Sequence, residues 1–280
     1  MDRKINYFEL KKEVQKKFLC EGIDEISDFD WICCEITGKR RSELGFIKEF
    51  TKEELAAINE AIEKRLKHIP IGYIFGKTDF YGREFVVTPD VLIPRIDTEI
   101  LIEKLIEEIK SRQKPVSVLD IGTGSGAIAI TLNKETGSKT TAVDISKNAL
   151  EIAKKNAKIN HADVDFIQSN LFDEISNFKF DIIVSNPPYI ESCKIAGLER
   201  EVKDNEPILA LDGGEDGLVF YRKIVEEAPK YLNANGKLFF EIGYNQGETV
   251  SSLMKKDFKN IQVVKDYSGN DRVVMGEMYD

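Results

Sequence analysis

Strand-like and helix-like segments alternate along the chain from residue 117 onward, and this alternation constrains the fold more than any other feature. The strand-like segments are short and rich in β-branched residues, and helix-like segments follow the first two of them. Strands that return through helices lie parallel in one sheet, with helices covering both faces. The sequence therefore predicts an α/β unit, with strands over 117–122, 140–145, 164–168, 180–186 and 237–243 and helices over GAIAITLNK and SKNALEIAKKNAKI.

The end of the chain has a different pattern. NIQVVKD and DRVVMGEM are separated by YSGN, a turn signal, so we expect the last two strands to form an antiparallel hairpin. A mostly parallel, Rossmann-like sheet of seven strands with a C-terminal antiparallel hairpin is similar to the fold of class I methyltransferases that use S-adenosyl-L-methionine (SAM).

Residues 1–75 show helical spacing and almost no strand signal. Helices are predicted around Tyr7–Leu19 and Phe29–Ile36. A third begins at Thr51, where an acidic first turn and a basic last turn suit the helix dipole. We predict a small helical-bundle domain over 1–75, which serves either substrate docking or only packing or dimerisation.

Glycine, proline, aromatic and β-branched residues replace this pattern after Pro70. We predict a β-hairpin linker over 76–97, with strands near 78–81 and 84–88 around Gly82. A helix over 98–111 then opens the SAM-dependent methyltransferase domain, predicted over 98–280.

The charge distribution bears on the partner. The net charge is −9, and residues 1–75 carry 14 Lys and Arg against 15 Asp and Glu, so the acidic excess lies in the second part of the chain. An acidic catalytic part does not suit duplex DNA, which needs a positive footprint, and we expect no direct nucleic acid binding. It suits a basic protein surface better.

The remaining composition limits the chemistry and the location. No apolar run reaches the length of a membrane span and the start MDRKINYFELKK is polar, so we expect a cytoplasmic protein with no membrane association. The cysteines are not spaced as metal ligands and the two histidines lie in polar surroundings, which predicts reduced thiols and no metal site. These residues are Cys20, Cys33, Cys34, Cys193, His68 and His161.

A glycine-rich turn, DIGTGSG, follows the first predicted strand and opens a helix. Glycine lets the backbone turn tightly and approach a ligand closely. The spacing is GxGxG after an aspartate instead of the GxGxxG of dinucleotide sites, which favours SAM over NAD. We therefore expect the turn to bind SAM through Gly122, Thr123, Gly124, Ser125 and Gly126.

Two more strand ends complete the predicted nucleoside site. Asp144 lies 24 positions after Asp120, at the end of the second strand, where its carboxylate can accept both ribose hydroxyls. The alternative, that Asp144 caps the following helix, is weaker because Ser146 can serve as the cap. At the third strand end, we expect Asn170 to accept a hydrogen bond from the adenine amine and Leu171 to contact the ring.

The fourth strand ends abruptly at Asn186, Pro187, Pro188 and Tyr189. A planar amine nitrogen that attacks a methyl sulfonium needs two acceptors on its two N–H groups, so that its lone pair faces the methyl group. Asn186 Oδ1 and the Pro187 carbonyl suit that role, and Tyr189 can pack on the flat substrate group. We assign catalysis to Asn186, Pro187 and Tyr189 and substrate binding to all four residues. The alternative is a proline turn that only closes the strand.

These motifs resemble the PrmC/HemK family. The resemblance is carried by PIGYIFGKTDFYGREFVV, VLIPRIDTE, VLDIGTGSGAIAI, AVDIS, NPPYI, EPILALDGGEDGLVFYRKI and FEIGYNQGE. It implies methyl transfer from SAM, with S-adenosyl-L-homocysteine as product, to the side-chain amide nitrogen N5 of the glutamine in the GGQ motif of peptide chain release factors, which modulates translation termination. It implies that the glycine turn, Asp144, Leu171 and Asn186 contact SAM. Asn186 to Tyr189 would then hold the glutamine.

The chain departs from the family pattern at two positions. Ile96 stands where the family usually has proline, and Asn170 stands where it usually has an acid near the adenine. Arg95 and Glu99 are interpreted either as an ion pair at a helix N-terminus or as contacts to the release-factor loop. The loop over 211–217 is interpreted either as a wall of the substrate cleft or as an ordinary connection.

Two other functional classes remain open at this level. A nucleic acid amino-methyltransferase, acting on adenine N6 or cytosine N4, uses a similar NPPY or DPPY corner, but it must grip phosphates and hold a flipped base. A SAM-binding scaffold without catalysis is the third class. Neither explains the chain as well as a glutamine methyltransferase, because the second part is acidic and the corner is intact.

Overall fold

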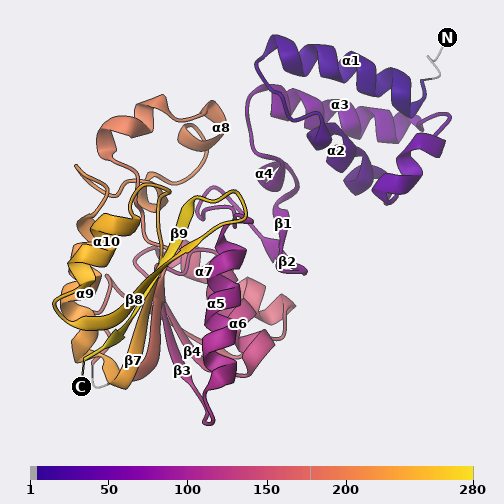
Figure 1. Ribbon diagram of the computed structural model, residues 1–280. Coiled ribbons are helices and arrows are strands. Elements are labelled where there is room, and N and C mark those ends of the chain that lie inside the picture. The colour runs from indigo at the N-terminus through magenta and orange to yellow at the C-terminus, as the bar shows by residue number, and fades with distance from the viewer. Residues whose placement is uncertain (1–4, 177, 280) are drawn as a thin grey trace. The chain divides into compact units, whose positions relative to one another are not determined.

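The structure is a computed structural model that describes residues 5–176 and 178–279, and the chain divides into two compact units. One unit comprises the chain up to Gly76 together with Glu199–Asn205. The other comprises Lys77–Leu198 and the chain from Glu206 onward. A short segment from the second half of the sequence, which contains the helix labelled α8 (Arg200–Lys203) in Figure 1, therefore belongs to the helical unit.

The first unit is helical, as the sequence predicts. Its helices are α1 (Tyr7–Cys20), α2 (Ser27–Thr37), α3 (Lys52–Leu66), the short α4 (Ile71–Phe75) and α8 (Arg200–Lys203), with a 3-10 helix over Arg41–Phe46. Thr51 caps α3, because its Oγ1 accepts a hydrogen bond from Glu54 N at 3.1 Å while the Glu54 carboxylate accepts one from Thr51 N at 2.8 Å. This reciprocal cap explains why the helix begins where the sequence indicates.

Arg65 connects α3 to the segment Glu199–Asn205. Its side chain is 2% exposed, and its guanidinium bonds Asp28 Oδ2 and Glu201 Oε2, each at 2.6 Å. Asn205 Nδ2 also donates to the His68 carbonyl at 3.0 Å. A buried cation shared between two carboxylates therefore holds the distant segment on the helical unit.

The second unit begins with a hairpin formed by β1 (Lys77–Phe80) and β2 (Arg83–Val86). Gly82, with φ +70°, lies in the turn between them. Phe80 and Phe85 are buried in the same core as the apolar face of α5 (Thr98–Ser111). The hairpin thus packs as part of the sheet-containing unit.

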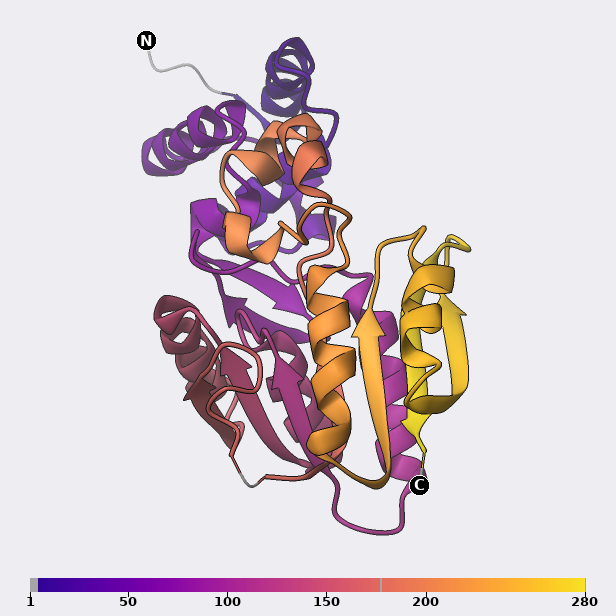
Figure 2. The same ribbon diagram turned by 90° about the vertical axis from the view of Figure 1, so that its left-hand side faces the viewer.

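The sheet of this unit has the order β5-β4-β3-β6-β7-β9-β8. Its first five strands in this order are parallel, and β9 runs antiparallel to β7 and β8, which confirms the predicted mostly parallel sheet with a C-terminal hairpin (Figure 2). The strands are β3 (Ser117–Ile121), β4 (Lys139–Asp144), β5 (Val164–Gln168), β6 (Phe180–Ser185), β7 (Leu232–Glu241), β8 (Phe258–Lys265) and β9 (Asp271–Met278).

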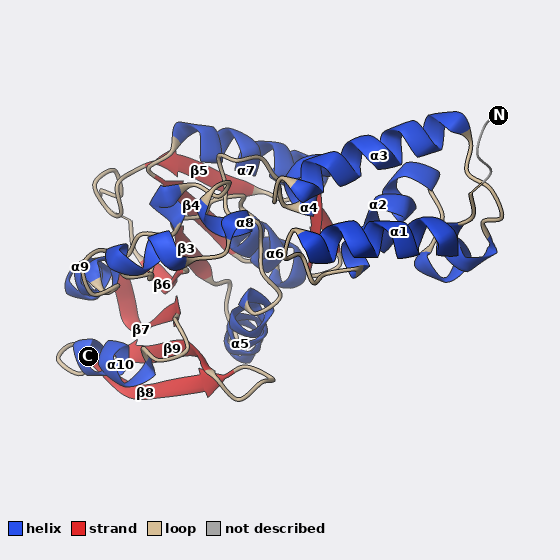
Figure 3. Ribbon diagram, turned by 90° about the horizontal axis from the view of Figure 1, so that it is seen from above, coloured by secondary structure: helices blue, strands red, loops and turns tan. Residues whose placement is uncertain are grey.

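Helices cover both faces of the sheet (Figure 3). Neighbouring strand residues point to opposite faces, so Leu119 and Ile183 belong to one core while Val118 and Ile182 belong to the other. The face of Val118 carries α5, α6 (Ala127–Thr136) and α7 (Lys147–Ile159), and the face of Leu119 carries α9 (Val219–Glu227) and α10 (Gly247–Met254). Further 3-10 helices span Ser192–Gly197, Ile208–Ala210 and Ala228–Lys230.

Within residues 5–176 and 178–279, no helix combines the length and apolar character that a membrane crossing requires.

The Arg65 cluster can be tested by removing its cation. We expect Arg65→Met to destabilise the helical unit by about 3 kcal/mol, because Asp28 and Glu201, which are both half-buried, would then lose the buried cation that they share. Urea unfolding would measure this loss, and trypsin should cleave faster after Arg200 and Lys203. The control is Lys64→Met, whose solvent-exposed pair with Glu60 contributes little to stability. Equal unfolding and cleavage of the two variants would contradict the assignment.

Candidate functional site

A cavity of about 350 Å³ lies in the second unit, at the carboxyl ends of β3, β4, β5 and β6. Open α/β sheets bind ligands at this edge, where the chain switches from one side of the sheet to the other. Ten predicted site residues line the cavity: Gly122, Thr123, Gly124, Ser125, Asp144, Asn170, Leu171, Asn186, Pro187 and Pro188. Gly126 and Tyr189 do not line it.

The glycine turn folds back on the end of β4. The amides of Gly122 and Thr123 donate to the Val143 carbonyl at 2.9 and 3.0 Å. Gly122 and Gly124 have φ values of +73° and +55°, which favour glycine, and a Cβ at either position would meet no atom within 4 Å. The turn therefore presents open backbone toward the cavity.

Gly126 has a different role from the other two glycines. A Cβ there would lie 2.8 Å from Ile130 Cδ1 and 3.1 Å from Ala153 Cβ. Its missing side chain allows α6 and α7 to pack closely, as the third glycine of such turns does in dinucleotide sites. Its predicted contact with SAM stays a prediction.

Asp120 holds the glycine turn in place through a hydrogen bond from Thr123. Burial raises the pKa of its carboxyl to about 7, against the hydrogen bonds that it accepts. Thr123 Oγ1 donates to Asp120 Oδ2 at 2.6 Å. Asp120 therefore supports the loop and does not line the cavity.

Asp144 lines the cavity and holds both neighbouring loops. Its Oδ2 accepts from Gly124 N and its Oδ1 from Ser146 N, each at 2.9 Å. Burial raises the pKa of this carboxyl. Each carboxylate oxygen can accept a second hydrogen bond, so both remain suited to a diol. Ser146 caps α7 through a hydrogen bond from Ala149 N, so Asp144 is not needed as the cap.

The β5 end contributes Asn170 and Leu171 to the cavity wall. Asn170 Nδ2 donates to Asp173 Oδ2 at 3.2 Å, which directs the amide nitrogen to the protein and leaves Oδ1 as the acceptor for a ligand amine. Leu171 has a φ of +54°, an uncommon value for a branched residue. The backbone at this strand end is therefore held in a special conformation beside the cavity.

The NPPY corner is packed closely from behind. A Cβ on Gly213 would lie 2.8 Å from the Pro188 carbonyl and the Tyr189 Cα, and a Cβ on Gly217 would overlap the Tyr189 carbonyl. Ile190 N and Gly213 N make backbone hydrogen bonds to Leu211 O and Ile190 O. The loop over 211–217 thus supports the corner directly and is not an ordinary connection.

Gln246, which follows β7, stabilises the contact between the NPPY corner and the loop over 211–217. Its Nε2 donates to the Tyr189 carbonyl at 3.1 Å and to the Gly217 carbonyl at 3.3 Å, while its Oε1 accepts from Gly243 N at 2.9 Å. The side-chain amide of Gln246 therefore joins the NPPY corner, the loop over 211–217 and the residues that follow β7. The sequence motif FEIGYNQGE contains this residue, but no local pattern indicated its role.

The side chain of Tyr189 packs against other residues of the protein and does not line the cavity. Burial, followed by the charge of Glu241, raises the pKa of its phenol to about 12, so the hydroxyl stays protonated at neutral pH. A Cβ on Gly243 would lie 3.5 Å from the Tyr189 ring. Packing of Tyr189 on a substrate stays a prediction.

Arg95 and Glu99 have separate partners, so of their two interpretations the ion pair between them is excluded. Arg95 Nη2 bonds Glu206 Oε1 at 2.6 Å, and Glu99 Oε1 accepts from Tyr81 N at 3.0 Å. Glu206 is almost fully buried, and Arg95 lines the cavity. Arg95 therefore connects the segment that precedes α5 to the segment that follows Asn205.

Asn156 is a further residue that the sequence reasoning missed. Its side chain is fully buried in α7 and bonds both the N–H and the carbonyl of Val86, at 2.7 and 2.9 Å. It also donates to the Ser125 carbonyl at 2.9 Å. A buried asparagine on the apolar face of a helix is the signal that could have identified this link between the hairpin and the glycine turn.

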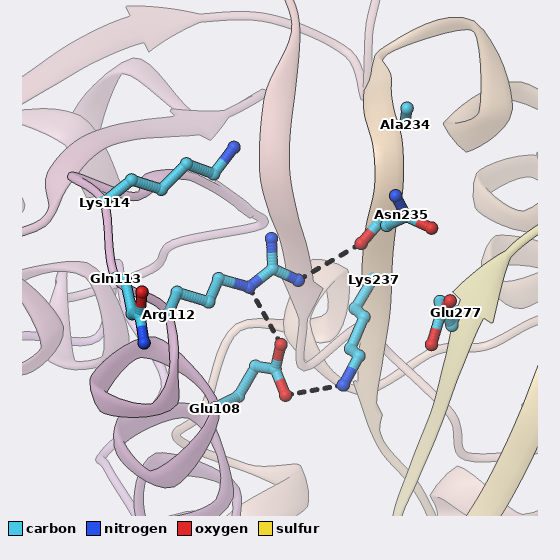
Figure 4. A pocket seen from close by; sticks show the side chains of 8 residues that line it. All are labelled: Glu108, Arg112, Gln113, Lys114, Ala234, Asn235, Lys237 and Glu277. Atoms are coloured by element: carbon cyan, nitrogen blue, oxygen red, sulfur yellow. Dashed lines mark hydrogen bonds and ion pairs between the residues drawn. The ribbon is translucent and has the colours of Figure 1, made fainter.

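A second cavity, of about 560 Å³, lies near the amino ends of β3 and β7 (Figure 4). Its cationic groups are already paired: Glu108 accepts from Arg112 Nε at 2.8 Å and from Lys237 Nζ at 2.6 Å, and Lys114 bonds Asp181 at 2.8 Å. These contacts are typical of a structural ion cluster. The cavity at the carboxyl edge is therefore the candidate site.

Comparisons with known proteins identify the family of the chain. The PrmC N-terminal domain family matches residues 15–76, and the Methyltransferase small domain family matches residues 95–213. A release factor glutamine methyltransferase from Geobacter sulfurreducens is 42% identical over 89% of this chain and 88% of its own length. One from Bacillus cereus is 42% identical over 93% of this chain and 95% of its own.

A solved structure supports the fold. A methyltransferase from Pyrococcus furiosus is 20% identical, with a TM-score of 0.53, over 71% of this chain and 90% of its own. Similarity at this level of identity shows a shared methyltransferase fold.

The glycine contact behind the corner can be tested with a matched pair. Gly217→Ala and Gly269→Ala both place alanine at a positive φ, which costs about 1 kcal/mol. A Cβ at Gly269 meets no atom within 4 Å, whereas at Gly217 it overlaps the Tyr189 backbone. We expect Gly217→Ala to lose a further amount of about 1–3 kcal/mol in urea unfolding. Equal losses of stability in the two variants would show that the loop over 211–217 shifts without disturbing the NPPY corner.

Proposed function

Because the chain belongs to the release factor glutamine methyltransferase family, we propose that it transfers the methyl group of SAM to the side-chain amide nitrogen of the glutamine in the GGQ motif of a peptide chain release factor. The observation that carries this proposal is the meeting of the open glycine turn, Asp144 and the NPPY corner at one cavity. The product of the donor is then S-adenosyl-L-homocysteine.

The residues of the cavity fit SAM. Gly122 and Gly124 offer backbone with no atom within 4 Å of a Cβ position, which suits close approach of a ligand. The Asp144 carboxylate suits the ribose hydroxyls, Asn170 Oδ1 suits the adenine amine, and Leu171 offers an apolar wall. Bound SAM supplies an electrophilic methyl group on a positively charged sulfur.

The corner then orients the glutamine amide. Asn186 Oδ1 and the Pro187 carbonyl accept its two N–H groups, which turns the nitrogen lone pair to the methyl group and stabilises the positive charge that develops on nitrogen. An N–C bond would form as the S–C bond breaks, which leaves a neutral thioether, and the methylated nitrogen would then lose one proton to water. Two successive prolines provide carbonyl acceptors without backbone donors, so no N–H of Pro187 or Pro188 competes.

The rest of the chain suits a protein substrate. We assign the helical unit to docking of the release factor, consistent with the PrmC N-terminal domain match over 15–76. The acidic excess of the second part suits a basic partner surface. The site of action is the cytoplasm, where release factors operate.

Mass spectrometry of a release factor after incubation with the protein and SAM tests the proposal. We expect a gain of one methyl group on the GGQ glutamine, and no gain in the factor's Gln→Ala variant. Methylation of DNA or RNA, with none of the release factor, would favour the nucleic acid amino-methyltransferase. No transfer to either class would support a scaffold.

Substitutions of Asn186 and Asp144 distinguish the methyl-transfer corner from the SAM-binding part of the site. We expect Asn186→Ala to reduce kcat by about 100-fold or more, because one of two acceptors for the reacting nitrogen is lost. Its affinity for SAM should stay within several-fold of wild type. Asp144→Ala should instead weaken SAM binding by about 10–100-fold through loss of charged hydrogen bonds. Calorimetric titration with SAM and single-turnover rates would measure both.

An equal loss of SAM affinity in the two variants would mean that the role given to Asn186 is wrong.

A further inference from the structure

Glu241, the last residue of β7, lies beside the reacting corner. The parallel register pairs Ser185 of β6 with Phe240 of β7, so Asn186 and Glu241 are the next neighbours along the two strands. Residues in register on parallel strands project to the same face of a sheet. This face carries α5, whose first residue is Thr98.

The Glu241 side chain contacts both of these neighbours. Its carboxyl lies close to the Thr98 hydroxyl and the Asn186 side-chain amide, two donors that lower the pKa of this carboxyl. Glu241 is 2% exposed, and its Oε2 has no hydrogen-bond partner among the described residues. A carboxyl group buried this deeply, with one oxygen unsatisfied, is costly, and such groups are concentrated at functional sites.

The charges around Glu241 leave it without a direct ion pair in the described structure. The charge of Arg272 of β9 lowers the pKa of Glu241, but the Arg272 guanidinium bonds Asp97 at 2.9 Å and Asp266 at 3.2 Å. The Tyr221 hydroxyl donates to the Glu241 main-chain carbonyl at 2.9 Å. The titratable and charged groups that act on this carboxyl from the surrounding elements are Asp97, Tyr189, Tyr221 and Arg272.

An ionised carboxylate can only accept hydrogen bonds, whereas an asparagine amide has one accepting oxygen and one donating nitrogen. Contact with ionised Glu241 therefore turns Asn186 Nδ2 toward the carboxylate and Oδ1 toward the cavity. A protonated Glu241 could donate to Oδ1, which would place the NH₂ group in the cavity instead. Only the first arrangement offers an acceptor to the substrate N–H.

We infer that Glu241 is a positioning residue, which orients the side-chain amide of Asn186 so that Oδ1 faces the glutamine amide. The inference rests on the proposed function, because it concerns the same methyl transfer. Glu241 acts through Asn186 and does not touch the substrate.

This role predicts a pH dependence. Burial raises the pKa of Glu241 to about 7, opposed by the Thr98 hydrogen bond and the Arg272 charge. The orienting carboxylate form is therefore present above about pH 7 and is lost as the pH falls. We expect kcat to reach a plateau above this value and to fall about tenfold per pH unit below it.

The first test compares Glu241→Gln with Glu248→Gln, which makes the same chemical change at an exposed position of α10. Glutamine fills the same space and removes a buried charge, so the fold should be retained. Because glutamine both donates and accepts, it allows both orientations of Asn186. We expect kcat at pH 8 to fall by about 10–100-fold through misplacement of the acceptor.

The KM for the release factor and the SAM affinity of Glu241→Gln should stay within about threefold of wild type. The fall of kcat at low pH, called the acidic limb below, should disappear in this variant. Glu248→Gln should match wild type in rate and in pH profile. A Glu241→Gln enzyme with wild-type kcat and an unchanged acidic limb would overturn the inference. A loss of SAM affinity and thermal stability in proportion to kcat would also overturn it, because it would show a structural role.

A second variant tests the same group independently. Thr98→Val removes the hydrogen bond that lowers the pKa of Glu241, so the acidic limb should move to higher pH. An unmoved limb would contradict the assignment. If wild-type protein transfers no methyl group to a release factor, the proposed function fails together with this inference. If wild type is active and only the variant results disagree, the inference alone fails.

Discussion

The in-register parallel pairing of β6 with β3 and β7 is the constraint on which the site depends. Ile121 pairs with Ser185, and Ser185 pairs with Phe240, so the three strands end level with one another. The glycine turn, the NPPY corner and Glu241 therefore emerge at one edge of the sheet. Ser185 reinforces the pairing, because its hydroxyl donates to the Ile121 carbonyl at 2.8 Å inside the core. A shift of one residue would turn Asn186 to the opposite face.

The stiffness of the corner comes from tertiary contacts as well as from its prolines. Two prolines restrict φ but do not place the corner in space. Gly213 and Gly217 let a second loop reach the Tyr189 backbone, and Gln246 bonds the two loops together. A reaction that depends on orienting a planar nitrogen needs such preorganisation, because small displacements of an acceptor cost large factors in rate.

Three carboxyl groups at this edge have different tasks, and of these Asp120 and Glu241 are buried while Asp144 is half-buried. Asp120 supports the glycine turn through Thr123, Asp144 joins that turn to α7 and faces the cavity, and Glu241 contacts Asn186. Burial raises the pKa of each. Donors oppose this rise: Thr123 for Asp120 and Ser146 for Asp144 are close in the sequence, whereas Gly124 for Asp144 and Thr98 for Glu241 are brought close only by the fold.

Short-range patterns by themselves determined the α/β class, the helical N-terminal part and the strand ends at which site residues occur. These features depend on periodicity, caps and turn residues, such as the Thr51 cap and the YSGN turn, which act over a few positions. Only the tertiary structure decided the partners of Arg95, Asn156, Glu241 and Gln246. Gln246 and Gly217 lie 29 positions apart along the chain, and Arg95 and Glu206 lie 111 positions apart. Spacing in a sequence specifies which face of an element a residue occupies, but strand register and loop packing decide what that face meets.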